Sequence, residues 1–263
     1  MEIKGTKDSH IQIPKSLLKP FSTPVSIVNS LGFKETPDMV FKMDMDGTIS
    51  QENIKETNTE FGYYEDIIET SLLKSIEDAF GNFKADLLKS VKANLPPVFS
   101  PSDILIVKKY CSLCLIRSQS FVSDIKNKSV FIDFLANAPQ NVVVYEYFKN
   151  PSLVDNYIPG DSISYIKNET DINYVLPQFY AIGMKQKNHR IDYFIPITPN
   201  VLVRLTSAKD QLNMGRMRES DVDNLNKYAI KEEFLNNHRA VYAKRKEDLE
   251  RYVPFIQSLS KGE

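Results

Sequence analysis

The sequence predicts an α+β fold, in which a mainly helical N-terminal half with a β-hairpin packs on a mostly antiparallel C-terminal sheet with a closing helix. Apolar residues recur every three or four positions through much of residues 65–125, as on one face of a helix. After Pro139, runs of β-branched and aromatic residues alternate with turns that are too short for crossover helices. The 263 residues suit a single domain, with a subdivision into residues 1–139 and 140–263 as the alternative.

A β-hairpin is expected over residues 39–49. Two short extended runs flank the pair Asp46 and Gly47, and glycine readily adopts the positive φ angle that a tight turn requires.

The first long helix is expected over residues 65–95. Gly81 interrupts it and marks a kink or a join between two helices. Its apolar stripe consists of Ile68, Leu72, Ile76, Phe80, Phe83, Leu87 and Val91.

A second helix is expected to begin after Ser100. Ser100 can cap it, Pro101 suits the first helical position, and the Asp103 carboxylate can bond back to the cap. A shorter helix is expected over residues 130–135.

The C-terminal half is expected to form the sheet. Its predicted strands cover residues 142–148, 162–166, 179–184, 193–197 and 201–205. A closing helix begins near Ser220, and residues 241–243 are read as a final strand.

Charge, hydropathy and cysteine content indicate the partners and the cellular compartment that the protein can have. The net charge of -1 gives no global attraction to nucleic acid or to an anionic membrane. No apolar run approaches the length of a membrane helix, and charged residues interrupt the first twenty positions where a signal peptide would have its apolar core. The only cysteines, Cys111 and Cys114, fit a reduced compartment. We therefore expect a cytoplasmic protein without a membrane partner.

Two short motifs are interpreted as structural. Residues 44–48 (DMDGT) match the nucleophile loop of haloacid-dehalogenase-type phosphatases, but Lys42 interrupts the strand before them, which favours a hairpin turn. A magnesium-dependent phosphatase at Asp44 and Asp46 is kept as a minor alternative. Cys111 and Cys114 form one CxxC inside a helical pattern, and are read as buried helical thiols. No metal site and no cofactor are predicted.

A series of short segments resembles a known family. They are the opening residues 10–21 with His10 and Pro14, an acidic helix with Glu69 and Glu77, Arg117 on the next helix, residues 195–199 (IPITP), and the pair Leu225 and Asn226. In this order they resemble an uncharacterised, mostly bacterial family, catalogued as domain of unknown function number 4238. The chain departs from the family pattern at Gln12, at Lys15 and at Cys114, where the family has a glutamine. The resemblance implies an effector that acts on nucleic acid or nucleotides in phage defence.

Five residues are candidates for the site of such an effector. His10 and Arg117 are the catalytic candidates, with acid–base work by the imidazole and stabilisation of phosphate charge by the guanidinium. Asn226, His238 and Arg239 are the binding candidates, since amide and cationic donors can hold phosphates. The alternative for Arg117 is a structural ion pair with Glu69 or Glu77, and the alternative for His10 is a structural role, which a lone histidine near a terminus more often has.

Two main functions therefore compete. In the first, the chain acts on nucleic acid or a nucleotide, and His10 and Arg117 meet in one cleft. In the second, it is a non-catalytic binding or regulatory protein that exposes an apolar or basic patch to another protein. The sequence leaves open whether the chain is an enzyme.

Overall fold

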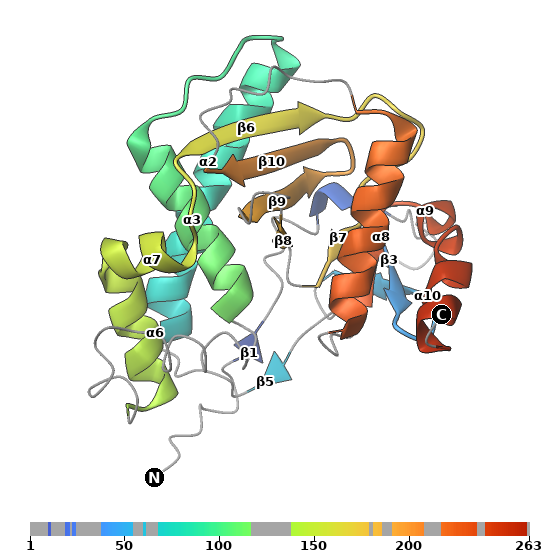
Figure 1. Cartoon of the computed structure of the whole chain (residues 1–263), viewed down its shortest axis with the longest axis horizontal. Coiled ribbons are helices and arrows are strands. Elements are labelled where there is room, and N and C mark those ends of the chain that lie inside the picture. Colours follow the sequence, from blue (N-terminus) through green and yellow to red (C-terminus); the bar gives the residue numbers. More distant parts are fainter. Residues whose placement is uncertain are drawn as a thin grey trace, which may run out of the picture.

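The structure is a computed structural model that describes residues 10–11, 19–21, 23–24, 38–54, 60–61, 68–116, 138–178, 181–185, 191–207, 217–235 and 240–261. It confirms the α+β prediction, because helices pack against two larger antiparallel sheets, and a third sheet has only the two strands β1 and β5 (Figure 1). Its helical elements are η1 (Lys19–Phe21), η3 (Ile68–Leu73), α2 (Lys74–Lys92), α3 (Pro101–Ile116), α6 (Gln140–Lys149), α7 (Pro151–Tyr157), α8 (Glu219–Leu235), α9 (Lys246–Glu250) and α10 (Val253–Ser260). Its strands are β1 (His10–Ile11), β2 (Thr23–Pro24), β3 (Asp38–Asp44), β4 (Ile49–Asn53), β5 (Glu60–Phe61), β6 (Ser162–Lys167), β7 (Leu176–Pro177), β8 (Ile182–Lys185), β9 (Ile191–Thr198), β10 (Val201–Thr206) and β11 (Ala240–Ala243).

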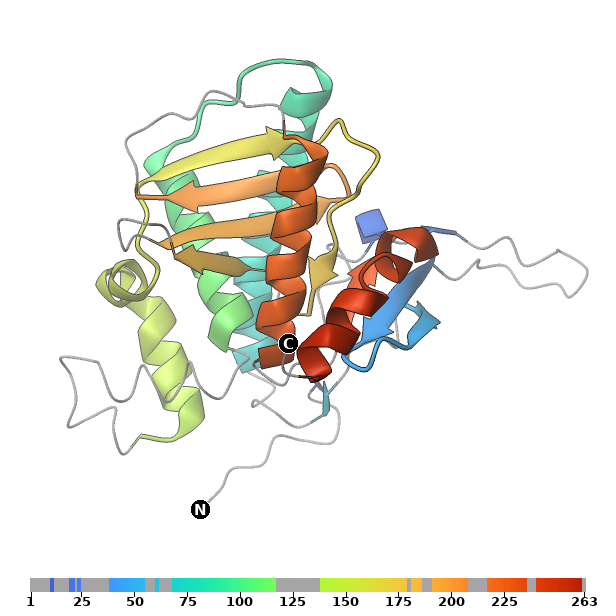
Figure 2. The same ribbon diagram turned by 45° about the vertical axis from the view of Figure 1, so that its right-hand side comes forward.

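The first sheet has four strands in the order β6-β10-β9-β8, all antiparallel. Side chains alternate across it: Ile195 and Val203 belong to the cluster shared with α2 and α3, while Phe194 and Leu202 pack with α8. Helices α2 and α3 lie behind the sheet and α8 in front of it (Figure 2). Apolar residues on both faces explain why β9 is buried along most of its length.

The second sheet joins distant parts of the chain. The β3–β4 hairpin pairs through β3 with β11, and β11 pairs with β7. The turn confirms the predicted hairpin, with Gly47 at a φ of 87°. One face carries Met43 and Val241, which pack with Leu249 of α9 and Ile256 of α10.

The long helices follow the sequence pattern closely. Helix α2 runs through Gly81 without a break, so the alternative of a join between two helices at this position is wrong. The cap of α3 is confirmed, because the Ser100 amide donates to Asp103 Oδ2 at 2.7 Å and the Asp103 amide donates to Ser100 Oγ at 3.3 Å. The Phe80 and Tyr110 rings stack at 3.7 Å and join α2 to α3.

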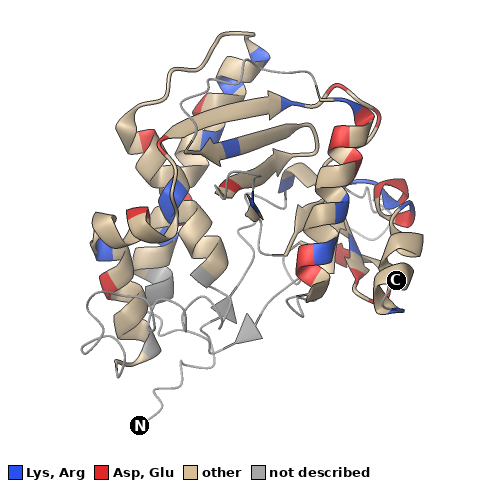
Figure 3. Cartoon of the chain, in the orientation of Figure 1, with Lys and Arg blue, Asp and Glu red and all other residues tan. Residues whose placement is uncertain are grey.

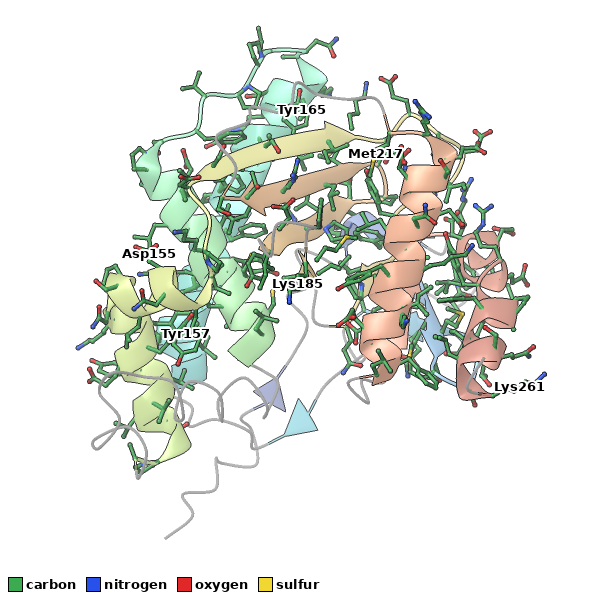
Figure 4. All side chains as sticks on the ribbon, viewed as in Figure 1. Asp155, Tyr157, Tyr165, Lys185, Met217 and Lys261 are labelled. Carbon is green, nitrogen blue, oxygen red and sulfur yellow. The ribbon has the colours of Figure 1, made fainter. Side chains whose placement is uncertain are left out.

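Helix α7 is fixed to α3 by an ion pair. Lys108 Nζ lies 2.6 Å from Asp155 Oδ1, and Tyr193 of β9 donates to the Tyr157 carbonyl at 3.5 Å. Asp155 and Tyr157 are marked in Figure 4 on the side of the molecule that α3 and α7 share.

The predicted strand at residues 142–148 is wrong, since this segment is helix α6. Val143, Val144, Tyr147 and Phe148 are buried together, a spacing that one helix face produces. Burial of that face therefore outweighs the strand preference of three consecutive valines. The strands predicted at residues 162–166, 193–197, 201–205 and 241–243 are confirmed, and the one at 179–184 is described as β8.

Cys111 and Cys114 are free thiols buried inside α3, as predicted. Burial raises the pKa of the Cys111 thiol well above its ordinary value. The helix predicted at residues 130–135 lies outside the described residues. Within the described part of the chain, no helix is both long and apolar enough to cross a membrane.

Candidate functional site

The structure describes only part of the predicted site. His10 belongs to β1, whose backbone pairs antiparallel with β5 and faces Phe61. Arg117, His238 and Arg239 lie outside the described residues. The meeting of His10 and Arg117 in one cleft therefore stays a prediction.

Asn226 is described in full and lies buried within α8. Its amide donates to the Asn173 carbonyl at 2.8 Å and to the Tyr252 hydroxyl at 3.0 Å, and its side-chain oxygen accepts from the Val175 amide at 3.1 Å. Both amide hydrogens and one oxygen lone pair are thus used inside the protein. In this arrangement Asn226 fastens the 173–175 segment and the start of α10 to α8.

Asp248 continues this network beside Asn226. Its buried carboxylate accepts from Arg245 Nε at 3.0 Å and Nη2 at 2.6 Å, and from Asn173 Nδ2 at 2.8 Å. The hydrogen bond to Asp248 raises the pKa of Arg245, so this guanidinium stays charged. Asn173, Asn226, Arg245, Asp248 and Tyr252 are called the polar clamp below. The polar clamp joins α8, which covers the first sheet, to α9 and α10, which cover the second.

Charge along α8 is mixed. Figure 3 shows acidic and basic residues interspersed on this helix. Lys227 Nζ pairs with Asp223 Oδ2 at 2.8 Å, one turn apart. Within the described residues, α8 therefore lacks the single-sign charge typical of a phosphate-binding face.

Asp44 and Asp46 lie at the tip of the β3–β4 hairpin. Lys42 Nζ lies 3.2 Å from Asp44 Oδ1 and 3.1 Å from Glu52 Oε1. Asp46 accepts from the Thr48 amide at 2.8 Å, which lowers the pKa of its carboxyl. Strand β3 has antiparallel neighbours on both sides, whereas a phosphatase loop of this kind leads out of a parallel sheet. The geometry therefore favours a structural turn. Within the described residues, no group of three or more His, Cys, Asp or Glu side chains is placed to hold a metal ion.

The loop between α2 and α3 exposes apolar side chains. Helix α2 ends through Asn94, whose positive φ of 53° lets the Leu95 amide reach the Ser90 carbonyl at 2.9 Å. Two prolines then prevent the helix from continuing. Leu95 is 60% exposed and Val98 is 94% exposed. The loop lies at the top of the molecule in Figure 1.

A pocket of about 120 Å³ lies beside these side chains. Its lining residues are Phe83, Asp86, Leu87, Ser90, Pro97, Val98, Phe99 and Asp103. The Phe83 and Phe99 rings, 5.9 Å apart, join the helix side of the pocket to its loop side. This pocket, together with Leu95 and Val98, is called the α2–α3 corner below.

Sequence reasoning missed the α2–α3 corner. The available signal is the run Leu95 to Phe99, an apolar stretch with two prolines between two amphipathic helices. Such a run shows that a loop is present, but its exposure depends on how the two helices pack.

The chain matches no family model, no curated protein and no solved structure.

Proposed function

We propose that the chain is a non-catalytic binding protein that engages a protein partner through the α2–α3 corner. The observation that carries this proposal is the 94% exposure of Val98, which lines a pocket whose walls combine apolar side chains with two carboxylates. Contiguous exposed apolar surface next to a concavity is typical of interaction sites. Burying one such aliphatic side chain contributes about 1.5–3 kcal/mol, enough to raise affinity by roughly tenfold or more.

The support around this observation is the rigidity of the corner. The stacked Phe80 and Tyr110 rings hold α2 on α3. The Ser100–Asp103 cap fixes the start of α3. A preformed surface loses little conformational entropy when a partner binds, so more of the contact energy appears as affinity.

The effector hypothesis stays a prediction from the sequence. Its catalytic candidate Arg117 lies outside the described residues. The described candidate Asn226 uses its amide within the polar clamp, which suits a structural part in a binding protein.

The experiment that tests the proposal is site-specific photocrosslinking in the source cells. A photoreactive residue replaces Val98 in one version of the full chain and Leu235 in the other. Leu235 is 61% exposed at the C-terminal end of α8, outside the α2–α3 corner, and serves as the matched control. A partner captured at position 98 is then purified, and its affinity is measured by calorimetry.

We expect Val98→Ser to weaken binding of the purified partner about tenfold, since an apolar side chain leaves the interface. Leu235→Ser should change the affinity less than about twofold. The proposal is wrong if position 98 captures no protein. It is also wrong if the captured partner binds the Val98→Ser and Leu235→Ser variants equally well.

A further inference from the structure

The α2–α3 corner also specifies what kind of partner segment it takes. We infer that the partner presents one apolar side chain flanked by Lys or Arg. This inference rests on the proposed function, and its first support is the size of the pocket. A volume of about 120 Å³ is smaller than the cavity of roughly 150 Å³ that accommodates benzene in a protein core. One side chain fills it, and Leu95 and Val98 then cover the neighbouring backbone.

The second support is the sign of the charge in the pocket lining. Its charged members are Asp86 and Asp103, and none of the lining residues is a cation. Both side-chain hydrogen bonds of Asp103 use Oδ2, so within the described residues its Oδ1 is open to a donor. A cation on the partner therefore meets an unused carboxylate oxygen beside the apolar contact.

Asp86 is also accessible to a cation. Its Oδ1 lies 2.9 Å from Lys89 Nζ, but both side chains are 77% exposed. A pair so fully solvated contributes little, so a partner Arg can take the place of Lys89.

The same charges argue against two other occupants. A second copy placed by a two-fold axis through this corner would bring four carboxylates together, and like charges in contact weaken an interface. Nucleic acid would bring phosphates to Asp86 and Asp103, where the repulsion has the same sign.

Three pools of fluorescent twelve-residue peptides test the inference. Each pool has a fixed central Leu, and the remaining positions are random mixtures of Lys and Arg, of Asp and Glu, or of Ser and Asn. A fourth pool carries the basic flanks around a central Ser. Anisotropy is measured with the full chain, with Val98→Ser, with the double variant Asp86→Asn plus Asp103→Asn, and with Leu235→Ser. Asparagine at position 103 keeps a side-chain oxygen for the cap of α3.

We expect the basic pool to bind the wild type about tenfold more tightly than the neutral pool, and the acidic pool more weakly than either. The double Asn variant should lose the preference for the basic pool while it keeps its affinity for the neutral pool. Val98→Ser and the central Ser should each weaken binding of the basic pool, and Leu235→Ser should leave it unchanged.

The remaining outcomes overturn the inference in distinguishable ways. Equal, Val98-dependent binding of all three Leu pools removes the charge preference but leaves the proposed function standing. If the basic pool binds Val98→Ser as tightly as the wild type, the contact lies outside the α2–α3 corner. Binding of no pool rejects this partner class, and the crosslinking experiment then decides the proposed function by itself. Val98-dependent self-association in sedimentation would identify a second copy as the occupant.

Discussion

Replacing Asn226 should destabilise the protein strongly, because its side chain makes three buried hydrogen bonds. Asn226→Ala leaves the Val175 amide, the Asn173 carbonyl and the Tyr252 hydroxyl without this partner. Because buried polar groups without partners are costly, we expect the free energy of unfolding to fall by about 2–4 kcal/mol. Urea unfolding measures this change.

The matched control is Asn224→Ala, on the exposed face of the same helix. It should change the free energy of unfolding by less than about 0.5 kcal/mol. If both substitutions changed the free energy of unfolding equally, the hydrogen bonds of Asn226 would not stabilise the protein as proposed.

Lys84 predicts a dependence of stability on pH. Burial lowers the pKa of its ammonium from 10.5 to about 8. Between these two values the unfolded chain binds more protons at this site than the folded chain does, so the contribution of Lys84 to stability rises with pH. Below pH 8 the cost of burying the charge is fully present.

The measurement compares wild type with Lys84→Met from pH 7 to pH 10, so that other titrating groups cancel. Relative to the variant, the wild type should gain about 2 kcal/mol across this range. A difference in unfolding free energy that does not vary with pH would contradict the lowered pKa.

Two buried tyrosines should respond in opposite ways to loss of the hydroxyl. Tyr174 Oη is buried and has no hydrogen-bond partner within the described residues, so Tyr174→Phe should leave stability unchanged or raise it by up to about 1 kcal/mol. Tyr147 Oη lies 2.8 Å from Ser112 Oγ, and Tyr147→Phe should lower stability by about 1 kcal/mol. Thermal unfolding compares them, and destabilisation by Tyr174→Phe would reveal a partner for that hydroxyl.

At the scale of elements, Gly81 gives a prediction for α2. The helix is continuous there, and a Cβ built at Gly81 meets no atom within 4 Å. Gly81→Ala should therefore stabilise the protein by about 0.5–1 kcal/mol, because alanine favours the helix.

Gly160→Ala is the contrasting change. Gly160 has a φ of 153°, and its added Cβ would lie 2.7 Å from Leu205 Cγ, so this substitution should destabilise. Calorimetric melting of both variants tests the pair. A lower melting temperature for Gly81→Ala would show that α2 needs its glycine.

The sequence predicted most of the elements that are marked by a local signal, such as a turn glycine or a helix cap. The hairpin follows from Gly47, and the start of α3 follows from Ser100 and Asp103. Helix α6 could not be predicted this way, because its valines favour a strand locally. Only the packing of Tyr147 and Phe148 against the core selects the helix.

The candidate sites were harder to predict than the elements. Asn226 was identified through a family resemblance, yet its partners Asn173 and Tyr252 are far from it in sequence and have no fixed spacing. The exposure of Val98 is likewise set by the packing of α2 on α3. Both properties belong to tertiary structure, which periodicity does not encode.

At the scale of the whole molecule, the two sheets are held together by side chains. The polar clamp ties the helix on the first sheet to the helices on the second. Apolar contacts reinforce it, since Ile230 of α8 packs with Leu249 and Ile256. The two sheets, with the helices that cover them, should therefore unfold together in the wild type.

The pairing of β3 with β11 has a consequence for synthesis of the protein. Strand β3 leaves the ribosome long before its neighbour β11, at Ala240–Ala243. The first sheet lies wholly between them in the chain and can assemble while translation continues. Until β11, α9 and α10 have emerged, Met43 and Phe41 lack the strand and helices that cover them, so the nascent hairpin exposes an unpaired strand edge and apolar side chains that favour aggregation.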